Sequence, residues 1–127
     1  MRLPRPSLIG CLLALPLAAH AQSPESSERC HDQRATADIV NCLVTVTAAA
    51  DKHLNAAYQR ALKAVDPSGV PALRAAERGW LEYRDQRCRY LSAGDGTIMR
   101  IVAASCTATM TKARADELDE DAKGVGQ

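Results

Sequence analysis

Apolar residues recur at steps of three and four along most of the chain after residue 35, which is the pattern of amphipathic helices. The first such stretch covers residues 36–64. Thr36 is a suitable N-cap, and Asp38 places a negative charge in the first turn, where it favours the helix dipole. Turn residues at 66–69 (DPSG) end this helix. Its expected buried face comprises Ile39, Leu43, Val46, Ala50, Leu54, Ala57 and Ala61.

Two more helices follow. Pro71 suits the first turn of a second helix, because its missing N–H would lack a partner there. Residues 92–96 (SAGDG) end that helix, and Thr97 can cap a third. The expected buried residues are Leu73, Ala76, Trp80, Tyr83 or Arg84, Cys88 and Leu91 in the second helix, and Ile98, Val102, Cys106, Met110, Ala113 and Leu118 in the third. No segment alternates with the period of a strand, so we expect an all-α fold, a small antiparallel three-helix bundle.

The first 21 residues have the layout of a secretory signal peptide. Arg2 and Arg5 form a positive start, residues 8–19 are apolar, and Ala19-His20-Ala21 offers a small-x-small cleavage site. The apolar stretch is too short to remain as a membrane span, so we expect none in the mature protein.

A second interpretation of the N-terminus is lipid attachment. Residues 8–11 (LIGC) resemble a lipobox that would use Cys11. A lipobox closes the hydrophobic region, whereas here most of that region follows the cysteine. A cleaved signal peptide is therefore the favoured interpretation.

The remaining chain divides into three parts. Residues 22–29 (QSPESSER) are polar and predict a disordered lead-in, residues 30–121 form one helical domain, and residues 122–127 form a flexible tail. The whole chain has 16 basic and 15 acidic residues, and it becomes nearly neutral without Arg2 and Arg5. Net charge therefore gives no reason to expect binding to nucleic acid.

Four cysteines follow the signal peptide: Cys30, Cys42, Cys88 and Cys106. In an exported protein they are expected to form disulfides, for which the sequence alone allows three pairings. The helix layout favours Cys30–Cys42, across the start of the first helix, and Cys88–Cys106, across the second turn. Each would contribute about 3 kcal/mol on the chain-entropy account.

The second helix contains a distinctive motif, W-x-x-Y-R-D-x-x-C, at residues 80–88, and the first helix contains D-x-x-L-N-x-x-Y at residues 51–58. Together with the glycine-rich turn, Cys106 and the spacing of Thr111, Arg114 and Leu118, these motifs resemble the LprI-type lysozyme inhibitor family of bacterial envelope proteins. The resemblance spans residues 30 to about 118. It implies a periplasmic or secreted protein that binds a lysozyme and obstructs its cleft. Glu77 and Gly79 depart from the family's usual Gln and Ala.

The motif residues favour a structural role. Trp80 is expected at the centre of the core, and Arg84 is expected to need a partner, either Asp51 or Asn55. Asp85 could bond Arg89. Gly79 could mark a close helix contact. The structural signature comprises Asp51, Leu54, Asn55, Tyr58, Trp80, Tyr83, Arg84, Asp85 and Arg114.

The predicted partner-binding loop is the second turn, because an inhibitor could place a protruding polar tip in a lysozyme cleft lined by two carboxyl groups. Its candidate residues are Ser92, Gly94, Asp95, Gly96 and Thr97. The alternative is a simple helix connector. Likewise, the acidic run at residues 116–121 could attract a cationic lysozyme, but we interpret it as a solvated, fraying helix end.

Other functional classes have little support in the sequence. His31 and His53 form no convincing nucleophile–base motif, and Cys30, His31 and Cys42 lack the usual zinc-ligand spacing. We therefore predict neither an enzyme, a metal site nor a cofactor. The alternative to a lysozyme inhibitor is a non-inhibitory envelope module that binds a secreted protein, a peptide or a cell-wall fragment. The sequence leaves the oligomeric state open.

Overall fold

The computed structural model describes residues 27–124. Its elements are α1 (Ser27–Cys30), α2 (Thr36–Ala64), the 3₁₀ turn η1 (Pro67–Gly69), α3 (Val70–Leu91) and α4 (Ile98–Gly124). No strand occurs among these residues, so the all-α prediction is confirmed. The expected signal peptide with Cys11, and residues 22–26 and 125–127, lie outside the described part.

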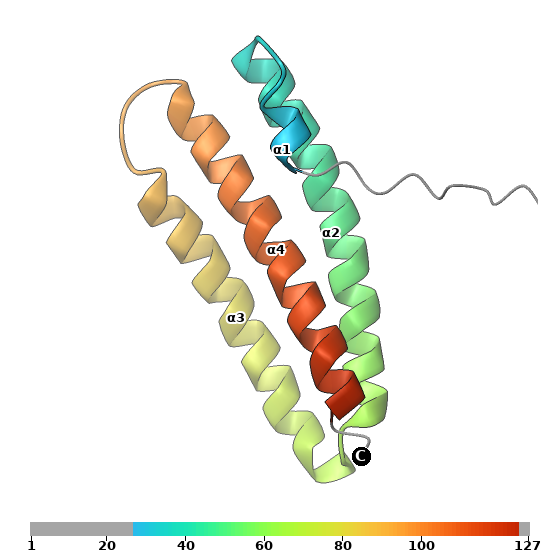
Figure 1. Cartoon of the computed structure of the whole chain (residues 1–127). Helices are drawn as coiled ribbons and strands as arrows, with labels where there is room; N and C mark the ends of the chain where they lie inside the picture. The colour runs from blue at the N-terminus through green and yellow to red at the C-terminus, as the bar shows by residue number, and fades with distance from the viewer. Residues whose placement is uncertain (1–26, 125–127) are drawn as a thin grey trace, which may run out of the picture.

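The three long helices form the predicted bundle, with α4 between α2 and α3 (Figure 1). Consecutive helices are antiparallel, so α2 and α4 run in the same direction. Residues 27–29 of the expected lead-in belong to helix α1, whose Cys30 is bonded to α2. Residues 122–124 of the expected tail belong to α4, where Ala122 packs on the core.

Alanine and leucine side chains make the contact between α2 and α4. Leu54, Ala57 and Ala61 of α2 pack with Ala115 and Leu118 of α4 in one buried cluster. A second cluster, nearer the start of α2, contains Cys30, Leu43 and Ile101. Alanine lets helix backbones approach closely, and it also has the highest helix propensity. The predicted face of α2 is confirmed, since five of its seven residues are buried and Ile39 and Val46 pack against the second cluster.

The predicted face of α4 was only partly correct. Leu118 is buried as expected, and Val102, Cys106 and Met110 are half-buried, but Ile98 and Ala113 are exposed. The buried residues are Ile101, Ala108, Thr111, Arg114, Ala115 and Leu118. The physical reason is the position of α4 between two helices. A helix that contacts two neighbours buries a wide surface, and a single stripe of apolar residues does not describe it.

Helix α3 also differs from its predicted pattern. Its only buried residues are Glu77 and Cys88, and the expected core residues Ala76, Tyr83 and Leu91 are exposed. Leu73 and Trp80 are partly buried against the α2–α4 cluster. Most of the surface of α3 therefore faces solvent.

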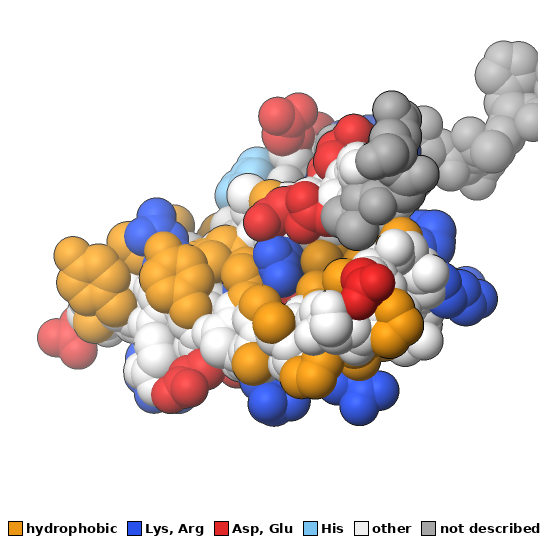
Figure 2. Space-filling view, turned by 90° about the horizontal axis from the view of Figure 1, so that it is seen from below, with side chains coloured by type: hydrophobic (Ala, Val, Ile, Leu, Met, Phe, Trp, Pro, Cys, Tyr) orange, Lys and Arg blue, Asp and Glu red, His pale blue; other side chains and the backbone are white. Residues whose placement is uncertain are grey.

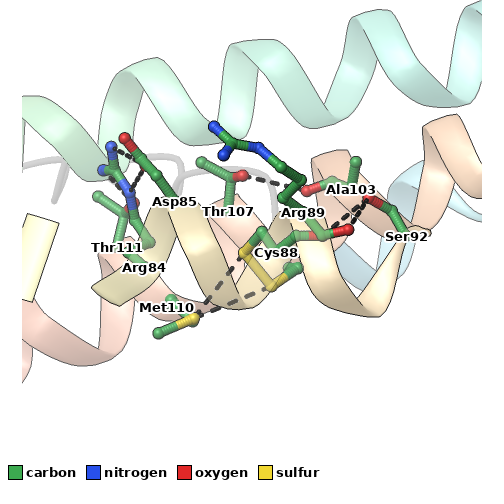
Figure 3. Close-up of a disulfide and its surroundings, with 10 residues drawn as sticks. Arg84, Asp85, Cys88, Arg89, Ser92, Ala103, Thr107, Met110 and Thr111 are labelled. Atoms are coloured by element: carbon green, nitrogen blue, oxygen red, sulfur yellow. Dashed lines mark hydrogen bonds and ion pairs between the residues drawn. A yellow bond between two sulfur atoms is a disulfide. The ribbon is translucent and has the colours of Figure 1, made fainter. Parts of the chain in front are cut away.

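Both predicted disulfides are confirmed. Cys30 is bonded to Cys42 and Cys88 to Cys106, with a Cα–Cα distance of 5.5 Å in each. The second joins the last turn of α3 to α4 (Figure 3), where Met110 Sδ lies 3.8 Å from both sulfur atoms. The two disulfides thus hold α1 to α2 and α3 to α4.

Gly79 does not mark a close helix contact, because a Cβ atom built there meets nothing within 4 Å. Gly79→Ala should therefore raise the free energy of unfolding by about 1 kcal/mol, the helix-propensity difference between the two residues. Urea denaturation of the oxidised protein measures this. Gly96→Ala is the contrasting variant and should destabilise, since Gly96 has a φ of +103° that side chains rarely adopt. A less stable Gly79→Ala protein would show that space at this position is restricted.

Candidate functional site

A buried ion pair joins α3 to α4. Arg114 Nε donates to Glu77 Oε2 at 3.0 Å, and each side chain is only 10% exposed. Arg114 Nη1 also lies 3.0 Å from Glu117 Oε1. Burial opposes the charged form, but the hydrogen bonds to Glu117 and Glu77 outweigh it, so the pKa of Arg114 is raised above its ordinary value. Arg114 therefore stays charged inside the bundle.

Arg84 makes a second polar link, this time among all three long helices. Its Nη1 donates to Thr111 Oγ1 of α4 at 3.2 Å and lies 3.6 Å from Asp51 Oδ1 of α2, one of the two partners named from the sequence. Its Nε donates to Asp85 Oδ1 at 3.0 Å (Figure 3). Asp85 thus bonds Arg84 and not Arg89, whose Nη1 donates to Gln86 Oε1.

Trp80 connects these charges to the apolar core. The guanidinium carbons of Arg84 and Arg114 lie 5.5 and 5.9 Å from the centre of its ring, within the range of cation–π attraction. The ring is partly buried and packs on the edge of the α2–α4 cluster. Trp80 is therefore at the margin of the core, where it supports the two arginines.

The structure does not use all signature residues in the same way. Leu54 is buried, Tyr58 packs beside it, and Asn55 is exposed. Tyr83 is 55% exposed and takes no part in the core. Between α2 and α3 lies an open groove of about 330 Å³, which is lined by Asp51, Leu54, Asn55, Tyr58, Arg74, Glu77, Arg78 and Leu81.

The predicted binding loop, residues 92–97, is anchored where it leaves α3. Ser92 Oγ donates to the Cys88 carbonyl at 2.8 Å, and the Ala93 N–H donates to the Tyr90 carbonyl at 3.2 Å. Beyond Ser92 the loop is exposed through Thr97. Because the Cys88–Cys106 disulfide joins the helices on both sides of it, the loop can present a polar tip at a small ordering cost.

The acidic run at residues 116–121 is largely neutralised within the protein. Asp116, Glu117 and Glu120 form ion pairs with neighbours on α4. Asp119 reaches α2, where its Oδ2 lies 2.7 Å from His53 Nε2 and its Oδ1 accepts from Arg60 Nη2 at 2.6 Å. Helix α4 continues to Gly124, so the acidic run lies within the helix.

A comparison with known families identifies the chain's relatives. The model of the family described as Lysozyme inhibitor LprI matches residues 27–118. The chain belongs to the LprI lysozyme inhibitor family. An uncharacterised protein of Rhizobium meliloti (strain 1021) is 30% identical over 135 residues, which cover 94% of this chain and 95% of the relative. No solved structure matches the chain.

None of the helices within residues 27–124 is long and apolar enough to cross a membrane. Over the same residues, no group of three or more His, Cys, Asp and Glu side chains is placed to hold a metal ion.

Sequence reasoning missed two parts of the arrangement. The first is the burial of Glu77, which the sequence analysis treats only as a departure from the family pattern. Its position, four residues after Leu73 and seven before Arg84, places it on the inward face of α3. The pairing of Asp119 with His53 and Arg60 had no sequence signal, because about 60 residues separate the partners.

The buried ion pair yields a stability prediction. Arg114→Met should lower the free energy of unfolding by about 3 kcal/mol or more, because it leaves the buried Glu77 without its partner. Adding Glu77→Leu removes that unpaired carboxylate, so the double variant should recover most of the loss. Urea denaturation of the two single variants and the double variant gives the coupling energy. If the double variant loses as much unfolding free energy as the two single variants together, Arg114 and Glu77 do not form a direct pair.

The Asp119 contacts predict an acid-dependent loss of stability. Hydrogen bonds from His53 and then Arg60 lower the pKa of Asp119 in the folded protein. The stabilisation by its charge is therefore complete above the unfolded pKa, about 3.9, and is lost as the pH falls through the lower folded value. Asp119→Asn should reduce the decline in unfolding free energy between about pH 5 and about pH 2.

Asp121→Asn is the matched control, since Asp121 is exposed and pairs with no residue that the structure describes. It should retain the acid dependence of the unaltered protein. An Asp119→Asn protein with the same acid dependence would assign that dependence to other carboxylates.

Proposed function

We propose that the protein is a periplasmic or secreted lysozyme inhibitor that binds a lysozyme and obstructs its cleft. The observation that carries this proposal is membership of the LprI lysozyme inhibitor family over residues 27–118. The two disulfides support the location, since such bonds persist in oxidising compartments outside the cytosol. The predicted signal peptide agrees with it.

Inhibition of this kind needs shape and contact only. A lysozyme cleft contains two carboxyl groups that act on the sugar chain, and a protein that fills the cleft excludes the substrate. Residues 92–97 suit this role because residues 93–97 are exposed, Asp95 and Thr97 are polar, and the loop is held between disulfide-linked helices. A loop already ordered before binding loses little conformational entropy in the complex.

The test is a titration of several lysozymes, each lysing bacterial cells, with the oxidised protein from residue 22 onward. We expect inhibition that saturates at a fixed molar ratio with at least one of them. The reduced protein should inhibit less, because the α3–α4 link that supports the loop is then absent. Replacing both Asp95 and Thr97 by Ala should weaken inhibition about tenfold if the loop enters the cleft.

Gln59→Ala, at an exposed position on α2, is the control and should inhibit fully. Thermal melts of all variants check that folding is unchanged. Full inhibition by the loop variant would move the contact away from residues 92–97. Absence of inhibition at a large molar excess for every lysozyme would overturn the proposal and favour a non-inhibitory envelope-binding module.

A further inference from the structure

Helix α3 presents an aromatic and basic face to solvent, made by Tyr83, Arg87 and Tyr90. Their spacing of four and three residues places them on one side of the helix. Tyr83 is 55% and Tyr90 75% exposed, and Arg87 is also exposed. Figure 2 shows hydrophobic side chains at the surface on its left, the side on which α3 lies in Figure 1. We call these three residues the Tyr–Arg face.

The face has no evident role inside the bundle. Among the residues that the structure describes, Arg87 forms no ion pair and neither tyrosine hydroxyl has a hydrogen-bond partner. Leu91 and Ile98, at the two ends of the 92–97 loop, are exposed as well, at 43% and 54%. Large side chains gathered at the surface in this way are typical of a contact surface.

The residue types of the Tyr–Arg face, and the bonds that hold the end of α3 in place, also suit tight binding. Tyrosine and arginine are enriched among the interface residues whose loss costs most affinity. Tyrosine supplies a large contact area with few rotatable bonds. The Cys88–Cys106 disulfide and the Ser92–Cys88 hydrogen bond fix the end of α3 that carries Tyr90. The backbone that carries Tyr90 is therefore held in place before a partner arrives.

Charge indicates which partner surface the face would fit. Between residues 86 and 100 there are three arginines, Arg87, Arg89 and Arg100, and a single carboxylate, Asp95. Four acidic residues near the end of α4, Asp116, Glu117, Asp119 and Glu120, are instead paired within the protein. The segment of residues 86–100 is thus basic, which complements the carboxylates in a lysozyme cleft.

We propose that the Tyr–Arg face and the 92–97 loop form one continuous contact with the lysozyme cleft. Arg87 pairs with a cleft carboxylate, for which the guanidinium geometry is suited, and Tyr83 and Tyr90 pack on the walls of the cleft. This inference rests on the proposed function. It goes further by naming the residues that hold the inhibitor in place and the chemical group that they recognise.

Arg87→Glu and Tyr90→Ser test the proposal. The probe is whichever lysozyme the unaltered oxidised protein inhibits, and both inhibition and calorimetric affinity are measured. Each variant should bind about tenfold more weakly or worse, with an unchanged melting temperature, because both side chains are exposed. Lys52→Glu and Val44→Ser apply matched changes at exposed positions on α2 and should bind as the unaltered protein does.

A second arm tests the cleft itself. The same calorimetry is repeated with a lysozyme variant in which both cleft carboxyl groups are changed to amides. If Arg87 pairs with one of them, the loss of affinity caused by Arg87→Glu should be much smaller when binding is measured with this lysozyme variant. An equally large loss of affinity would overturn the assignment of Arg87 to the cleft.

The remaining outcomes are distinguishable. If the unaltered protein inhibits a lysozyme and both α3 variants inhibit equally well, the Tyr–Arg face is overturned while the proposed function stands. If the unaltered protein inhibits no lysozyme, both fall together. If sedimentation shows a dimer that Tyr90→Ser separates, the face is a contact between two copies and the lysozyme assignment is overturned.

Discussion

The attachment of α3 to α4 differs in kind from the rest of the packing in the bundle. α3 buries two residues, Glu77 and Cys88, and neither acts mainly through hydrophobic contact. Glu77 pairs with Arg114 and Cys88 is bonded to Cys106. By contrast, α2 and α4 pack through alanine and leucine side chains. The ion pair and the disulfide attach α3 to α4, so α3 needs few buried apolar side chains. Large side chains of α3 can therefore remain exposed.

This arrangement separates the family motif from the surface that we propose for binding. The guanidinium groups of Arg84 and Arg114 lie near the ring of Trp80, and their hydrogen bonds are made to Asp85, Thr111 and Glu77. These contacts explain why a W-x-x-Y-R-D motif, with its charged residues, is compatible with a stable bundle. Tyr83 belongs to the same motif but points away from the core, on the side of α3 shared with Arg87 and Tyr90. One helix thus carries both the structural link and the proposed contact.

The acidic run of α4 and the segment around the 92–97 loop differ in how their charges are paired. In the acidic run, Asp116, Glu117, Asp119 and Glu120 form ion pairs with Lys112, Arg114, Arg60 and Lys123. Between residues 86 and 100, arginines outnumber carboxylates. Paired charges contribute little to long-range attraction, whereas unpaired arginines can orient the protein toward acidic groups on a partner.

The helices, the disulfide pairs and the family were predictable from the sequence, because they depend on local spacing, turn residues and the residue types of the two motifs. The face of α2 was predictable since that helix packs mainly on one neighbour. The buried residues of α3 and α4 follow only from the packed bundle, because α4 lies between two helices and α3 is held at few points. The Arg114–Glu77 and Asp119–His53 pairs also depend on that packing, since partners far apart in the chain meet only when helices pack.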